Sequence, residues 1–165
     1  KFEKTGILYV RNYRPGLDLS WQDVFQTDSK AKVGQYCKRH QINCEWIAED
    51  HLRTKQVSQA TLVHPTTKEK VWFNQAHLFH ASSLDDKLNA ALVESFGSDN
   101  LPRDAFFGDG EVIPIAMLDE INAAIAAEKV TFEWGKYDIL LLDNLLMTHG
   151  RNAYEGHRKV AVAMM

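Results

Sequence analysis

The C-terminal part of the chain alternates between short apolar segments and polar turns, and this pattern constrains the fold more than any other feature. The apolar segments are residues 130–134, 139–142, 147–149 and 159–163. Short apolar runs between turn residues are typical of β-strands. A strand that is apolar on both faces is usually covered on both sides. We therefore expect a buried strand at 139–142, with Leu141 in the core.

Patterns in the rest of the chain predict further strands and several helices. Strands are expected at 6–13, 45–47 and 52–54, and a β-hairpin at 60–64 and 70–74. Helices are expected after Ser20, where the sequence resembles a capping box, and at 30–39, 83–96 and 114–128. A sharp turn is expected at 108–110, and no dinucleotide-binding or P-loop motif occurs. The sequence therefore predicts a mostly β chain with helical insertions, arranged as a double-sheet jelly roll rather than a Rossmann fold.

Composition and charge exclude several classes of protein. The chain has 165 residues, 45% of them hydrophobic, which favours a single folded domain over 1–165. A net charge of −3 without a dominant basic patch argues against nucleic acid as a partner. No apolar run approaches the ~20 residues that cross a bilayer, so no membrane partner is expected. Cys37 and Cys44 have neither a metal-binding spacing nor a disulfide framework, which predicts reduced thiols in a cytoplasmic protein.

A histidine and an arginine follow the strand expected at 139–142. Asp143-Asn144 begins a turn, His149 stands in a His-Gly-Arg triplet, and Arg158 follows His149 by nine positions. Taken alone, His149 would be an ordinary polar residue at a strand end, and Arg158 a partner in a surface ion pair. The whole pattern, however, resembles the C-terminal signature of the TauD/TfdA (taurine dioxygenase) family of non-haem iron, 2-oxoglutarate-dependent oxygenases.

The resemblance implies roles for both residues: His149 is the distal iron ligand, and Arg158 clamps the far carboxylate of the cosubstrate. A planar guanidinium pairs with a carboxylate at two points, which suits Arg158 to that role. The resemblance covers essentially the whole chain, because 6–13, 19–25 and 64–75 look like the branch of the family related to syringomycin-biosynthesis hydroxylases.

The same resemblance implies a double-stranded β-helix, Fe(II) and 2-oxoglutarate as cofactors, and hydroxylation of an unactivated C–H bond. The implied substrate is an amino acid or a related small molecule. It is either free or tethered to a carrier protein during natural-product biosynthesis. This last inference rests on analogy with the family alone.

The metal ligands that such a site needs are incomplete in this sequence. A non-haem Fe(II) oxygenase binds iron through two histidines and one carboxylate. In the family two of these form a His-x-Asp or His-x-Glu motif, which is absent from the 165 residues. We therefore expect the C-terminal portion of a longer oxygenase, inactive alone, whose jelly roll is incomplete without an N-terminal segment. A second copy of the chain would also cover unpaired strands, which leaves a homo-oligomer open. The alternative is a jelly-roll binding or scaffold module without a complete metal site.

Other polar residues have two interpretations each. Asn74 and Arg151 are candidate substrate-binding residues, although Asn74 also suits strand-end hydrogen bonds and Arg151 suits an ion pair with a nearby carboxylate. His77 and His80 are three positions apart and would share a metal if they lay on one helix face. One packed and one solvated histidine is the commoner outcome, and we expect it here.

Overall fold

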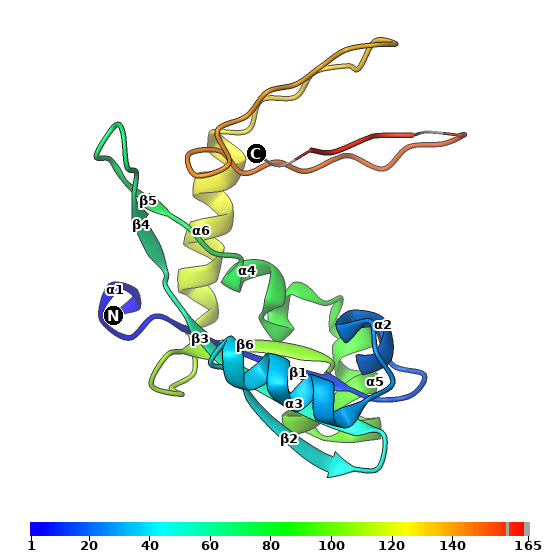
Figure 1. Ribbon diagram of the computed structural model, residues 1–165. Coiled ribbons are helices and arrows are strands. Elements are labelled where there is room, and N and C mark those ends of the chain that lie inside the picture. Colours follow the sequence, from blue (N-terminus) through cyan, green and yellow to red (C-terminus); the bar gives the residue numbers. More distant parts are fainter. Residues whose placement is uncertain (158, 164–165) are drawn as a thin grey trace.

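A four-stranded antiparallel sheet forms the centre of the fold. The computed structural model describes residues 1–157 and 159–163. The strands are β1 (Ile7–Tyr13), β2 (Asn43–Ala48), β3 (His51–Ser58) and β6 (Arg103–Phe107), in the order β2-β3-β1-β6 (Figure 1). The central strand β1 pairs antiparallel with both β3 and β6. The strands predicted at 6–13, 45–47 and 52–54 are confirmed, and the last two are the arms of one hairpin.

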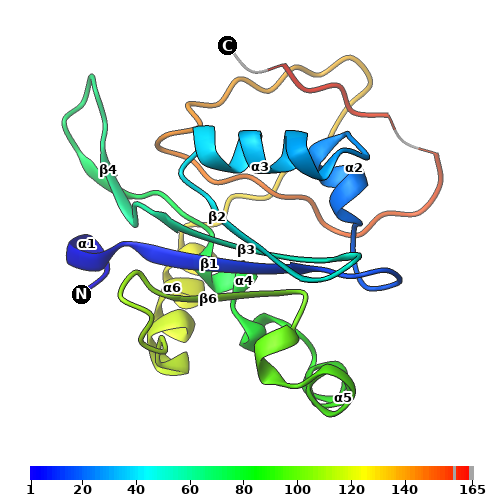
Figure 2. The ribbon, with the colours of Figure 1, turned by 60° about the horizontal axis from the view of Figure 1, so that its bottom comes forward.

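Two helices lie beside β2 and β3 (Figure 2). They are α2 (Trp21–Phe25) and α3 (Lys30–Arg39), and α3 confirms the helix expected at 30–39. Their apolar sides meet the sheet in one core cluster, which removes apolar surface from water and stabilises this half of the fold. The buried members of the cluster are Tyr13, Trp21, Val33, Cys37 and Leu52.

Helices begin where the sequence offers a capping side chain. The Oγ of Ser20 accepts the backbone N–H of Asp23 at 3.1 Å, which confirms the predicted helix start. The Oδ1 of Asp85 accepts the N–H of Lys87 at 3.0 Å and starts α5 (Asp86–Phe96), which lies within the helix-prone region expected at 83–96. Two short 3₁₀ helices, Ala81–Ser83 and Ser98–Asn100, flank α5.

A second core cluster lies where β1 and β6 meet α4 (Ala76–Phe79) and α6 (Ile115–Ala127). Helix α6 confirms the helix expected at 114–128. The hairpin of β4 (Thr61–Val63) and β5 (Lys70–Trp72) is also confirmed and forms a separate two-stranded sheet. The buried members of this cluster are Ile7, Ala60, Ala76, Ala105, Phe107, Ile113 and Leu118.

The turn after β6 brings two distant backbone segments together. The N–H of Gly110 donates to the carbonyl oxygen of Phe107 at 2.8 Å and closes the turn expected at 108–110. A Cβ on Gly108 would lie 1.8 Å from the carbonyl oxygen of Thr5, at the end of α1 (Phe2–Thr5). Only glycine allows this approach, because any side chain would clash with the backbone.

The C-terminal segment, residues 129–157 and 159–163, differs from the prediction. The strands predicted at 130–134, 139–142, 147–149 and 159–163 are absent from the described residues, so these predictions are wrong for this structure. Figure 1 shows the segment in orange and red as a looped trace beyond α6, away from the four-stranded sheet. A strand needs a neighbour for its backbone N–H and C=O groups. No strand of the described part pairs with this segment.

Apolar side chains of the C-terminal segment are exposed as a result. Ile139 is 93% exposed and Leu141 is 80% exposed. The prediction that Leu141 lies in the core is therefore wrong here, because burial requires a covering layer that the described residues do not supply.

Replacing Leu141 by alanine in the 165-residue chain should change the free energy of unfolding by less than about 0.5 kcal/mol, because an exposed side chain loses few contacts. Denaturant unfolding of the two proteins measures this difference. Leu118→Ala, which removes a buried side chain of α6, is the positive control. A large loss in Leu141→Ala would show that this residue is packed in solution.

The fold class that follows is antiparallel sheet with helices. The described residues form antiparallel sheets together with helices, and the helices hold more residues than the strands. The jelly roll stays a prediction. Among the described residues, no helix is both long and apolar enough to cross a membrane.

Candidate functional site

His149 lies just beyond a tight turn that Asp143 organises. The carbonyl oxygen of Asp143 accepts the N–H of Leu146 at 3.1 Å and the N–H of Met147 at 2.9 Å. The Oδ1 of Asp143 accepts the N–H of Leu145 at 3.0 Å. These bonds fix the turn 143–147 from both the main chain and the side chain. His149 follows two residues later with an exposed side chain, accessible to a ligand.

His64, on the β4–β5 hairpin, binds the same aspartate. Its Nε2 lies 3.0 Å from Oδ2 of Asp143, across 79 residues of sequence. The backbone N–H of Thr67 donates to the other ring nitrogen, Nδ1, at 3.0 Å. The Leu145 N–H and then His64 lower the pKa of Asp143, because both donate to its carboxylate. No local sequence pattern predicts this pair, because His64 and Asp143 are 79 positions apart.

The other candidate residues lie in different surroundings. Arg151 is exposed, and its guanidinium carbon lies 5.6 Å from the ring centre of Tyr154, which is a cation–π arrangement. Asn74 donates through Nδ2 to the carbonyl oxygen of Ala60 at 3.1 Å and accepts the Ala76 N–H at 2.8 Å. Asn74 therefore makes the strand-end hydrogen bonds that were its alternative interpretation. Arg158 lies outside the described residues.

His77 and His80 are both buried, so the expectation of one packed and one solvated histidine is wrong. Helix α4 is only one turn long and packs against the sheet, which leaves neither side chain in solvent. The Nδ1 of His80 accepts the Ser82 N–H at 3.1 Å, whereas the Nδ1 of His77 is buried without a hydrogen bond. Neither joins His149 in a metal site, because the described residues contain no cluster of three metal-binding side chains.

Burial lowers the pKa of His77, which gives a pH dependence of stability. The folded pKa is below the unfolded value of about 6.5, so the folded state favours the neutral ring. The contribution of His77 is therefore complete above about pH 6.5 and is lost as the pH falls through the folded pKa. Denaturant unfolding between about pH 7.5 and 5 should show this fall, and His77→Gln should reduce its steepness. An unchanged steepness would assign the effect to other groups.

A buried polar network joins β1 and β3 to the 3₁₀ helix at Ser98–Asn100. The Oδ1 of Asn12 lies 3.1 Å from Nε2 of His51 and accepts the Nε–H of Arg53 at 2.9 Å. The Arg53 guanidinium also donates to Oδ1 of Asn100 at 2.8 Å. Burial, followed by the charges of Arg14 and Arg53, lowers the pKa of His51. Its bonds are internal to the fold, so we assign this network to stability.

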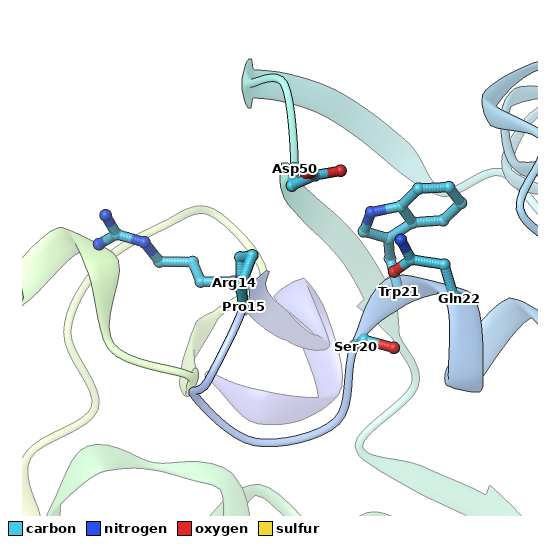
Figure 3. A pocket seen from close by; sticks show the side chains of 6 residues that line it. All are labelled: Arg14, Pro15, Ser20, Trp21, Gln22 and Asp50. Atoms are coloured by element: carbon cyan, nitrogen blue, oxygen red, sulfur yellow. The ribbon is translucent and has the colours of Figure 1, made fainter.

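Neither of two hollows on the surface of the described residues contains a predicted site residue. Figure 3 shows the first, of about 220 Å³, which is lined by Arg14, Pro15, Ser20, Trp21, Gln22 and Asp50. The second, of about 360 Å³, lies between the sheet and helices α2 and α3, with Tyr9, Arg11 and Tyr36 among its lining residues. His149 lines neither hollow. It lies on the exposed C-terminal segment, just after the turn 143–147.

Comparison with known proteins identifies the family. Residues 4–164 match the family described as "Taurine catabolism dioxygenase TauD, TfdA family". The chain belongs to the TauD/TfdA family. The dapdiamide synthesis protein DdaC of Enterobacter agglomerans is 46% identical over 165 residues, which are 100% of this chain and 50% of that protein. A clavaminate synthase-like protein of Arabidopsis thaliana is 26% identical over 172 residues, covering 99% of this chain and 48% of that protein. The chain spans about half the length of these curated relatives.

The residues of this TauD/TfdA chain fit part of an iron site. An exposed imidazole, such as that of His149, is a suitable type of ligand for Fe(II). A complete facial set needs a second histidine and a carboxylate. The described residues hold no such cluster, and the sequence holds no His-x-Asp or His-x-Glu motif. In the described residues His149 is therefore a candidate ligand without a complete set of partners.

Proposed function

We propose that the chain is part of an Fe(II)- and 2-oxoglutarate-dependent dioxygenase. The observation that carries this proposal is His149, exposed beyond the Asp143 turn and followed nine positions later by Arg158, in a chain of the TauD/TfdA family. In this proposal His149 binds iron, Arg158 clamps the far carboxylate of 2-oxoglutarate, and Arg151 contacts the substrate. Bound iron would bring 2-oxoglutarate and dioxygen together. Dioxygen would be the oxidant, one of its oxygen atoms going to the hydroxylated C–H bond and the other to succinate as 2-oxoglutarate loses CO2.

The second histidine and the carboxylate would come from outside these 165 residues. The curated relatives are about twice as long as the matched region, which leaves room for a His-x-Asp or His-x-Glu segment. The same segment would supply strands that pair with the apolar runs of 130–163 and complete a jelly roll. One comparison tests this part of the proposal: Leu141→Ala should clearly destabilise the full-length protein while leaving the 165-residue chain unchanged.

The proposed substrate is an amino acid or a related small molecule, free or tethered to a carrier protein. One relative is named for dapdiamide synthesis, and we propose by analogy a role in natural-product biosynthesis. No nucleic acid or membrane partner is part of the proposal. A cytoplasmic location agrees with Cys37 and Cys44, which form no disulfide.

The direct test uses the full-length protein, purified without oxygen, loaded with Fe(II) and then supplied with 2-oxoglutarate and dioxygen. Succinate release is measured with free amino acids and with the same amino acids on a carrier protein. Substrate-stimulated succinate that requires Fe(II) is the expected result. The absence of any 2-oxoglutarate turnover would favour the second candidate, a jelly-roll binding or scaffold module, which the incomplete ligand set of the described residues also allows.

A further inference from the structure

His64 is held on the β4–β5 hairpin by both its main chain and its side chain. Its N–H donates to the carbonyl oxygen of Glu69 at 2.8 Å, and its own carbonyl oxygen accepts the N–H of Lys68 at 3.0 Å. The side chain is only 6% exposed. A buried imidazole with this much local support occupies one fixed position and direction.

The hydrogen bonds of the ring decide which nitrogen carries the proton. Nδ1 accepts the backbone N–H of Thr67 at 3.0 Å, so Nδ1 carries no hydrogen. The hydrogen is therefore on Nε2, which donates to Oδ2 of Asp143 at 3.0 Å. Because the acceptor is an ionised carboxylate, this bond belongs to the stronger class of charge-assisted hydrogen bonds.

The carboxylate of Asp143 links the hairpin to the turn before His149. One oxygen binds His64, and the other accepts the Leu145 N–H that helps to form the turn 143–147. His149 lies two positions after Met147, and an extended chain covers at most about 3.6 Å per residue. The chain alone keeps the Cα of His149 within about 7 Å of the Cα of Met147. Fixing the turn 143–147 therefore fixes the point from which the short connection to His149 starts.

We propose that His64 is a positioning residue for His149. Its Nε2–H holds the Asp143 carboxylate, which holds the turn 143–147 and thereby limits where the His149 imidazole can lie. The metal-ligand role of His149 in this inference rests on the proposed function, whereas the fixing of the turn by His64 does not.

Two substitutions separate the two hydrogen bonds of the ring. In His64→Asn, the amide oxygen lies near the position of Nδ1 and keeps the bond from Thr67, but nothing reaches Asp143. In His64→Gln, the amide group extends to about the position of Nε2 and again donates to Asp143. Loss of packing alone would affect both variants, whereas loss of the Asp143 bond would affect only His64→Asn.

His80 supplies a matched control within the same chain. It is also buried, and its Nδ1 accepts the backbone N–H of Ser82 at 3.1 Å, as the Nδ1 of His64 does from Thr67. Unlike His64, it has no carboxylate within hydrogen-bond distance of Nε2 among the described residues. His80→Asn therefore reproduces the general cost of replacing a buried, turn-capping histidine.

The experiment compares these variants in the full-length protein with two readouts. Backbone amide exchange of residues 145–149 is measured without metal, and the dissociation constant of Fe(II) is measured separately. In His64→Asn we expect about tenfold faster exchange and about tenfold weaker Fe(II) binding, the change that follows from losing one charge-assisted hydrogen bond. His64→Gln should stay within about threefold of the wild type in both the exchange rate and the Fe(II) dissociation constant. His80→Asn should stay within the same limit.

Wild-type exchange in His64→Asn would overturn the proposal, as would equal losses in His64→Asn and His64→Gln. If His64→Asn does not fold, Asp143→Asn is used instead. Its single amide oxygen cannot accept from both His64 and the Leu145 N–H, and it carries no charge, so exchange should again be faster. A wild-type protein that binds no Fe(II) would contradict the proposed function. Faster exchange in His64→Asn would still support the fixing of the turn in that case.

Discussion

His149→Ala in the full-length protein is expected to abolish Fe(II) retention and 2-oxoglutarate turnover together. The change removes one of three protein ligands, and two remaining ligands do not complete a facial set. Both losses should appear in one variant because His149 is proposed to bind the metal itself. Iron content after gel filtration and succinate release measure the two effects.

His157→Ala is the matched control for this change. It removes another exposed histidine of the same C-terminal segment and should leave both measurements at the wild-type level. Normal iron content in His149→Ala would place the ligand at another residue. Loss of activity with full iron content would make His149 a substrate or positioning residue instead.

Arg158→Lys is expected to raise the KM for 2-oxoglutarate by about ten- to a hundredfold, and more than the KM for the prime substrate. Lysine keeps the positive charge but loses the planar two-point contact with the carboxylate. Losing one charge-assisted hydrogen bond costs on the order of 1.5–3 kcal/mol, which corresponds to that range of affinity. Initial rates at varied 2-oxoglutarate and saturating prime substrate give the value.

Arg151→Lys distinguishes the two arginines of the C-terminal segment. We expect it to change the KM for the prime substrate and to leave the 2-oxoglutarate dependence alone. The reverse pattern, with Arg151→Lys raising the KM for 2-oxoglutarate and Arg158→Lys silent, would assign the clamp to Arg151.

Local signals in the sequence predicted most of the first 128 residues. The Ser20 cap, the apolar spacing of α3 and α6, and the hairpin of β4 and β5 depend on residues a few positions apart, so short patterns are sufficient to find them. The strands expected in 130–163 depend on a neighbouring strand, which is a long-range property. The alternation of apolar segments and turns in 130–163 indicates that these segments can pair as strands. The described residues supply no strand that pairs with them.

In the candidate site, too, the contacts between residues close in sequence could be predicted, and the contacts between distant residues could not. His149 was found because Asp143, the turn and the histidine lie close together in the sequence and resemble a known signature. His64 was missed because its partner is 79 residues away. The only local sign was Thr67, three positions after His64, which has a backbone N–H within reach of the ring. That sign indicates a capped turn but says nothing about Asp143.

Two aspartates flank the exposed apolar run 139–142, and their placement affects how copies of this chain meet in solution. Asp138 precedes the run and Asp143 follows it. Charged residues at the ends of an apolar β-prone stretch act as gatekeepers, because stacking identical stretches would bring like charges together. We therefore expect the Asp143 that holds the turn before His149 also to oppose fibre-like aggregation. A substitution that removed the charge of Asp143 would therefore weaken its bond to His64 and also remove a charge that opposes aggregation.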